Sequence, residues 1–211
     1  MPKCAGRAIK DLLHQNYDNC LEMNNMPLLF TMSEDDLNKA DAIHGHISYE
    51  YVKNLKQFKR FTFMRDPLER TISQYNHFMT MKTSVEEAEI LRLHNYSFLD
   101  FVKTNNPNLA LWVNIYTVQL GDDCSPVYNV KEYLKRAIKN IGHMDFIGIY
   151  EDMDESIKKL KKKFNLKGDL KTVGKTPDKN KVCQITAKER KIAKKYLIPD
   201  YILYNMARGA I

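Results

Sequence analysis

Cysteine is scarce in this sequence, and its four copies do not stand in a metal-binding pattern. They are widely scattered, at Cys4, Cys20, Cys124 and Cys183, and no C-x-x-C pair occurs. Structural zinc sites and dense disulfide frameworks need closely spaced cysteines, so the sequence favours neither. We therefore expect free thiols and no bound metal.

Long apolar runs are also absent. The longest cover residues 27–30 and 146–150, whereas a bilayer span needs roughly 20 residues. The first seven residues, MPKCAGR, lack the apolar stretch of a secretory signal. The sequence as it stands predicts no membrane span and a cytoplasmic location, unless a segment upstream of Met1 directs the chain elsewhere.

Glycine and proline are few, at eight and seven copies, and we find neither a low-complexity stretch nor a repeat of solenoid period. No segment therefore qualifies as a linker between domains. The chain has 211 residues, of which 44% are hydrophobic, and this is enough to bury a core. These properties exclude wholesale disorder and predict a single domain over residues 1–211.

Basic residues outnumber acidic ones, with 33 Lys and Arg against 26 Asp and Glu and a formal charge of +7. Such an excess indicates an anionic partner, but charge alone does not distinguish a nucleic acid, a nucleotide, a sulfated sugar and a membrane surface. Much of the excess lies in residues 158–163, KKLKKK. We interpret that run as the solvated face of a helix.

Short apolar runs alternate with helical patterns along the chain. Strands are predicted at 28–31, 42–44, 60–64 and 145–150. Helices are predicted at 6–15, 33–39, 49–55, 67–81, 97–103, 130–140, 153–164 and 186–197, with a last one after Pro199. This alternation predicts an α/β fold with a parallel β-sheet flanked by helices. Ligands of such sheets bind at the carboxyl ends of the strands.

The first candidate site is the segment PKCAGRAI at residues 2–9, just before an amphipathic helix. Small residues let backbone N–H groups approach an anion, the helix N-terminus adds partial positive charge, and Lys3 can reach the same oxygens. The segment lacks the Walker spacing G-x-x-x-x-G-K-[ST]. Taken alone, an ordinary basic segment before a helix explains it as well.

The second candidate is FTFMRDPLERTISQY at residues 61–75, where a strand leads to Arg65 and Pro67 begins a helix. Arg65 and Ser73, two turns into that helix, could reach one anion, because a guanidinium offers a planar fork of donors. The alternative is an Arg65–Asp66 pair that only caps the helix.

Together these two segments resemble the cofactor motifs of sulfotransferases that use 3′-phosphoadenosine 5′-phosphosulfate (PAPS). Segments 146–156 and 200–204 are similar to the late strand–helix unit and the closing helix of the carbohydrate sulfotransferases, so the resemblance covers nearly the whole chain. It implies a P-loop NTPase-like sulfotransferase fold. In that fold a buried strand precedes the first loop, so we expect this first strand to be missing or truncated here, with the true start upstream of Met1.

The resemblance also implies which residues bind PAPS. The first loop would hold the 5′-phosphosulfate, and Arg65 and Ser73 would hold the 3′-phosphate. Lys175, in a region where related enzymes have a basic loop near the nucleotide, would add a contact, although an exposed loop explains it equally well. Family members usually carry hydroxyl residues after the glycine, where this chain has arginine and alanine. The loop residues are Lys3, Cys4, Ala5, Gly6, Arg7 and Ala8.

Two histidines, His44 and His46, follow the second predicted strand. Transfer of a sulfuryl group to an alcohol needs a general base, and imidazole titrates near neutrality. In an extended segment the two side chains lie on one side. The His-Gly-His block resembles that of uronosyl 2-O-sulfotransferases, which places the base on His46. The alternatives are His44 and a carboxylate such as Glu50.

The predicted function is transfer of a sulfuryl group from PAPS to a hydroxyl of an acceptor. The expected acceptor is a carbohydrate, and an acidic sugar would also account for part of the basic excess. His46 would take the proton, and Lys3 would stabilise the departing phosphate oxygen. Two other classes compete. A P-loop kinase or other phosphotransferase needs a Walker lysine–hydroxyl pair and a carboxylate for Mg²⁺, and neither stands at the right spacing. A nucleic-acid or polyanion binder predicts basic residues interleaved with aromatics, whereas the lysines here gather late in the chain.

Overall fold

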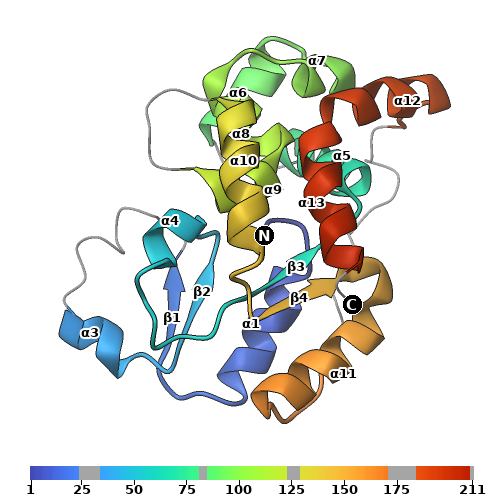
Figure 1. The fold of residues 1–211 in the computed structure, drawn as a ribbon. Coiled ribbons are helices and arrows are strands. Elements are labelled where there is room, and N and C mark those ends of the chain that lie inside the picture. The colour runs from blue at the N-terminus through green and yellow to red at the C-terminus, as the bar shows by residue number, and fades with distance from the viewer. Residues whose placement is uncertain (24–33, 81–84, 123–128, 171–183, 210–211) are drawn as a thin grey trace.

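The computed structural model describes residues 1–23, 34–80, 85–122, 129–170 and 184–209 (Figure 1). Three predicted features fall outside these ranges: the strand at 28–31, Ser33 at the start of the helix predicted at 33–39, and Lys175. So do Cys124 and Cys183, whereas Cys4 and Cys20 are free thiols.

The strands form two parallel pairs. β1 (Cys20–Met23) pairs with β2 (Ala42–Gly45), and β3 (Phe61–Met64) pairs with β4 (Phe146–Ile149). The parallel pairing confirms the α/β prediction. The prediction of one parallel sheet was wrong for the described part of the chain, because β2 and β3 do not pair with each other and the strands form two separate sheets. β1 was not predicted, since its four residues, CLEM, include a charged one and give no apolar run.

Most helices lie where the sequence predicts them, and three more were not predicted. The predicted ones are α1 (Gly6–His14), α3 (Glu34–Lys39), α4 (Tyr49–Val52), α5 (Pro67–Thr80), α7 (Phe98–Val102), α10 (Val130–Ile141), α11 (Met153–Phe164), α12 (Ala187–Tyr196) and α13 (Ile198–Gly209). The others are α6 (Glu86–Leu93), α8 (Pro107–Val113) and α9 (Ile115–Gly121), and a 3₁₀ turn, η1 (Tyr150–Asp152), follows β4. None of the described helices is long and apolar enough to cross a membrane.

Local sequence explains how the two helices nearest the candidate site begin and pack. α1 buries Ala8, Ile9, Leu12 and Leu13 on one face, the spacing of an amphipathic helix. α5 begins at Pro67, and Asp66 Oδ1 accepts hydrogen bonds from the backbone N–H groups of Leu68 and Glu69, each 3.0 Å long. An aspartate cap followed by proline is a strong helix start.

The core consists of two clusters that meet. One packs α1, β3 and β4 against α9, α10, α11 and α13, and the other packs α5 to α8 against α12. Trp112 and Tyr201 contact both clusters. Figure 1 shows α10 and α13 running from the helical end toward the strands, so they join the two parts.

Candidate active site

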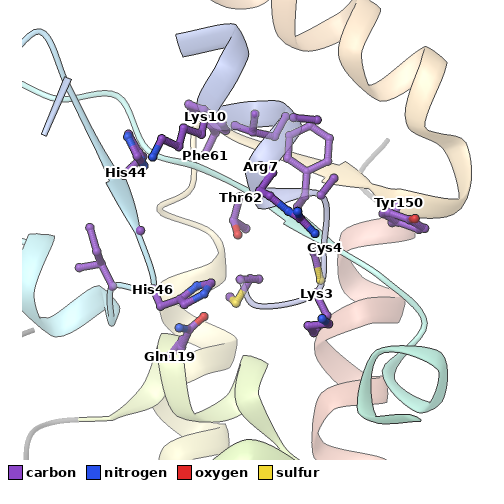
Figure 2. A pocket seen from close by; sticks show the side chains of 18 of the residues that line it. Lys3, Cys4, Arg7, Lys10, His44, His46, Phe61, Thr62, Gln119 and Tyr150 are labelled. Atoms are coloured by element: carbon purple, nitrogen blue, oxygen red, sulfur yellow. The ribbon is translucent and has the colours of Figure 1, made fainter. Parts of the chain in front are cut away.

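One large cavity, of about 1840 Å³, lies beside the carboxyl ends of β2 and β3 and is also lined by α1 and α5 (Figure 2). Every sequence-predicted site residue that the structure describes lines this cavity. From the first loop these are Lys3, Cys4, Ala5, Gly6, Arg7 and Ala8, and from elsewhere His44, His46, Arg65 and Ser73. Two loops that are about sixty positions apart in the chain therefore face one space.

The first loop has an unusual backbone. Lys3 and Ala5 have φ values of 61° and 68°, in the left-handed region that residues other than glycine rarely adopt. No side chain caps the N-terminus of α1, so its first N–H groups are available to a ligand. A Cβ added to Gly6 would meet no heavy atom of the described chain within 4 Å. Open space beside strained backbone and free N–H groups is the arrangement of an anion-binding loop.

Three cationic side chains converge at this loop. The pKa of Lys3 is lowered by burial first, and then by the positive charges of Arg7 and Arg65. Among the described residues, no carboxylate forms an ion pair with any of the three; the nearby pairs are Lys10–Glu22 and Arg190–Glu69. Ala8 is buried and has no polar side-chain group, so of the two residues after Gly6 only Arg7 offers the cavity a polar side chain. An anion in the cavity would relieve the mutual repulsion of the three cations.

Arg65 is held from two sides. Its guanidinium carbon lies 4.7 Å from the centre of the Tyr150 ring, a cation–π contact. Its backbone N–H donates to the Tyr116 hydroxyl over 2.8 Å. Asp66 caps α5 instead of pairing with Arg65, so the guanidinium stays available to the cavity that Ser73 also lines. Of the alternative drawn from the sequence, an Arg65–Asp66 pair that only caps the helix, the structure confirms the helix cap by Asp66 but not the pairing with Arg65.

His46 lies where its imidazole is neutral. The side chain is still exposed to the cavity, yet desolvation by surrounding atoms, the amino group of Met1 and the charge of Lys3 lower its pKa to about 4. The direction of this shift keeps the imidazole unprotonated at pH 7, in the form that accepts a proton. Figure 2 shows His46 beside Gln119.

His44 occupies a different part of the same cavity. Its ring meets His14 edge-on, with centroids 5.5 Å apart, and its Nε2 is buried without a hydrogen-bond partner among the described residues. Burial lowers the pKa of His44 first, with Lys10 and His14 adding to this and Glu22 opposing it. Figure 2 shows His44 beside Lys10 and not beside His46. We expected the side chains of His44 and His46 to lie on one side of an extended segment. They do not, because β2 ends at Gly45, whose φ is 150°, so the segment is not a regular strand up to His46.

Several lining residues were not identified from the sequence. Ser73 shares the cavity-facing side of α5 with Asn76, His77 and Thr80. Burial, Lys3 and Arg7 lower the pKa of His77, in that order of importance. The spacing i, i+3, i+4, i+7 of these polar residues was the available signal. Gln119, on α9, is buried and also faces the cavity.

The chain belongs to the Sulfotransferase family, whose profile matches residues 1–205. The match covers both loops, the histidine segment and most of α13. The comparison with curated proteins found no match, and neither did the comparison with solved structures. The protein is therefore a transferase of the sulfotransferase family, and its small parallel sheets flanked by helices agree with that assignment.

Proposed function

We propose that this sulfotransferase takes its sulfuryl group from PAPS and transfers it to a hydroxyl of a carbohydrate. One observation carries the proposal. Three cations from two loops, Lys3, Arg7 and Arg65, meet in the cavity that also holds His46, and none of them forms an ion pair within the described part of the chain. A nucleotide with phosphates at both ends needs two separated cationic subsites. The P-loop-like form of the fold is part of the same proposal.

The residues present fit PAPS. Lys3, Cys4, Ala5, Gly6, Arg7 and Ala8 would surround the 5′-phosphosulfate, with the free N–H groups of α1 as donors. Arg65 and Ser73 would hold the 3′-phosphate. The cavity of about 1840 Å³ exceeds the 300–1,000 Å³ typical of one small-molecule site, which leaves room for an acceptor. Lys175 remains a candidate contact outside the described residues.

PAPS would supply the sulfuryl group: its sulfur–oxygen bond to phosphate breaks as the acceptor oxygen bonds to sulfur, leaving adenosine 3′,5′-bisphosphate. His46 accepts the acceptor's hydroxyl proton and later releases it to solvent. Lys3 stabilises the negative charge that develops on the departing phosphate oxygen. Gln119, beside His46, is placed to orient the acceptor hydroxyl. His44 is the alternative base, with its partnerless Nε2 as the accepting atom.

Ligand-dependent melting tests the donor assignment. Adenosine 3′,5′-bisphosphate should raise the melting temperature more than ADP with Mg²⁺ at equal concentration, because only the former has an anion for the Arg65 and Ser73 subsite. A larger shift with ADP and Mg²⁺ would favour a phosphotransferase and reject the proposal. Transfer of labelled sulfate from PAPS to a panel of oligosaccharides, lipids and small alcohols then tests the acceptor class.

A further inference from the structure

Tyr116, at the start of α9, contacts both loops of the candidate active site through one hydroxyl group. Its side chain is fully buried, with 0% of its surface exposed. The hydroxyl accepts a hydrogen bond from Arg65 N over 2.8 Å and donates one to the Arg65 carbonyl over 2.7 Å. It also lies 3.3 Å from Cys4 Sγ. The Cys4 thiol also lies 3.3 Å from the Pro2 carbonyl as a donor, so its one proton is available to either oxygen while the thiol and the hydroxyl stay in contact.

The position of the Tyr116 ring is itself fixed by other elements. Asp200, on α13, is fully buried and accepts hydrogen bonds from Tyr116 N over 3.1 Å and from Thr117 N over 2.8 Å. The Thr117 hydroxyl donates to the same carboxylate over 2.9 Å. The Arg70 guanidinium lies 5.9 Å from the Tyr116 ring centre. A buried hydrogen-bond network therefore fixes the position of the hydroxyl, so a movement of either loop would break its contact with the hydroxyl.

The two loops that meet at this hydroxyl carry the two proposed phosphate subsites. Cys4 lies between Lys3 and Ala5, the two residues with left-handed backbone, so holding its side chain holds the first loop. Fixing both the N–H and the carbonyl of Arg65 likewise holds the second loop where the guanidinium projects. The distance between the two cationic subsites then depends on one side chain.

We propose that Tyr116 is a positioning residue that sets the spacing between the 5′- and 3′-phosphate subsites and so selects nucleotides that carry both groups. This inference rests on the proposed function. A ligand with two anions gains affinity from the second one only when the subsites are held at the matching distance. A ligand with one anion does not depend on that distance.

The test compares three ligands on wild-type protein and on Tyr116→Phe, which keeps the ring and removes the hydroxyl. Calorimetry would measure the affinities for adenosine 3′,5′-bisphosphate, adenosine 5′-monophosphate and adenosine 3′-monophosphate. We expect about a tenfold loss for the bisphosphate, the size that corresponds to about 1.4 kcal/mol, and less than about a twofold change for each monophosphate.

Tyr75→Phe is the matched control. Tyr75 is also buried, its hydroxyl donates to the Tyr96 carbonyl over 2.8 Å, and it packs in the helical cluster without lining the cavity. It should lower the melting temperature without changing the ratio of bisphosphate to monophosphate affinity. The same behaviour in Tyr116→Phe, or equal losses for all three ligands, would reduce Tyr116 to a structural role and overturn the inference.

A second variant keeps the inference testable where Tyr116→Phe does not fold. Cys4→Ala removes the other end of the contact and should also weaken the bisphosphate selectively; unchanged selectivity overturns the inference. Measurements on the wild-type protein distinguish failure of the proposed function from failure of the role of Tyr116. Lack of preference for the bisphosphate over ADP in the wild type contradicts the proposed function, whereas preference in the wild type that Tyr116→Phe retains contradicts only the role of Tyr116.

Discussion

At the scale of one residue, His46 shows how its surroundings keep an imidazole neutral. Desolvation first, and then neighbouring positive charge, lower its pKa to about 4, so the imidazole is neutral across the physiological range. Part of this positive charge comes from Lys3, which belongs to the proposed anion site. An anion bound there would offset that charge and raise the pKa of His46, which makes the imidazole a stronger base when the donor is in place.

The pKa of His46 should therefore rise when adenosine 3′,5′-bisphosphate binds. An NMR titration of the imidazole, with and without the ligand, measures this without knowledge of the acceptor. By linkage, the ligand should bind more tightly as the pH falls through the range between the two pKa values. A pKa of His46 that stays unchanged on binding would separate the histidine from the anion site.

Replacing His46 with alanine should leave affinity for adenosine 3′,5′-bisphosphate within about twofold, because a neutral side chain contributes little to anion binding. Sulfate transfer should fall by about 10²–10⁴-fold, the usual contribution of a general base. His94→Ala is the control, since His94 is exposed and does not line the cavity. Full activity of His46→Ala would move the role to His44.

At the scale of the element, α13 supports the site although it contributes no residue to the cavity lining. Asp200 caps α9 through Tyr116 and Thr117, as described above. The Tyr201 hydroxyl donates to both carboxylate oxygens of Asp66 over 3.1 Å. The Tyr204 hydroxyl donates to Glu151 Oε2 over 2.9 Å, and Glu151 Oε1 accepts from Asp66 N over 2.9 Å.

Asp200→Asn should destabilise the protein by about 1–3 kcal/mol, because the amide loses one acceptor and leaves a buried N–H of α9 unpaired. Burial raises the pKa of Asp200 to about 6, against the opposing effects of Arg70 and the hydrogen bonds from α9. A carboxyl whose folded pKa is raised contributes stability at acid pH that is lost as the pH rises from about 4 to about 6. The difference in free energy of unfolding between wild type and Asp200→Asn should therefore shrink over that range.

Urea unfolding at pH 4.5 and pH 7.5 would measure this difference. Asp154→Asn, at an exposed position of α11, serves as the control and should leave stability unchanged at both pH values. A wild-type advantage that grows with pH would show that the carboxylate is stabilised by its partners more than burial penalises it.

At the scale of the whole molecule, the net charge of +7 is divided between two regions with different properties. α11 buries Ser156, Ile157 and Leu160 and exposes Lys158, Lys162 and Lys163, which confirms the solvated face predicted from the sequence. No lysine of α11 lines the cavity. The cations that do line it include Lys3, Arg7 and Arg65 from the two loops, so only part of the excess charge is available to a ligand in the cavity.

Replacing Lys158 and Lys162 together with glutamine should thus change affinity for adenosine 3′,5′-bisphosphate by less than about twofold, since these exposed charges do not line the cavity and are screened by salt. Lys3→Gln should weaken it by about 10–100-fold, the range of a lost charge-assisted hydrogen bond. Calorimetry at one fixed salt concentration measures both. Equal losses in the two variants would indicate a diffuse polyanion-binding surface instead of a defined site.

The sequence by itself determined the elements and loops whose signals are local. Apolar spacing located α1, α10 and α11; Pro67 and Asp66 located the start of α5; and short apolar runs located β2, β3 and β4. Since parallel strands place their following loops at one edge of a sheet, the same patterns also indicated that His46 and Arg65 would share a space, and the family resemblance added Lys3 to them. All three line one cavity.

Only the tertiary structure decided how these elements meet. The separation of β2 from β3, the cavity-facing position of Gln119 and the support from α13 depend on contacts between distant segments. Tyr116 makes this plainest: its hydroxyl meets Cys4 across 112 positions of the chain and Arg65 across 51. Periodicity reports which face of a helix is buried but not what that face contacts. From the sequence, a tyrosine in an apolar helix is therefore predicted to be a core residue. The hydrogen-bond partners of its hydroxyl are defined only by the tertiary structure.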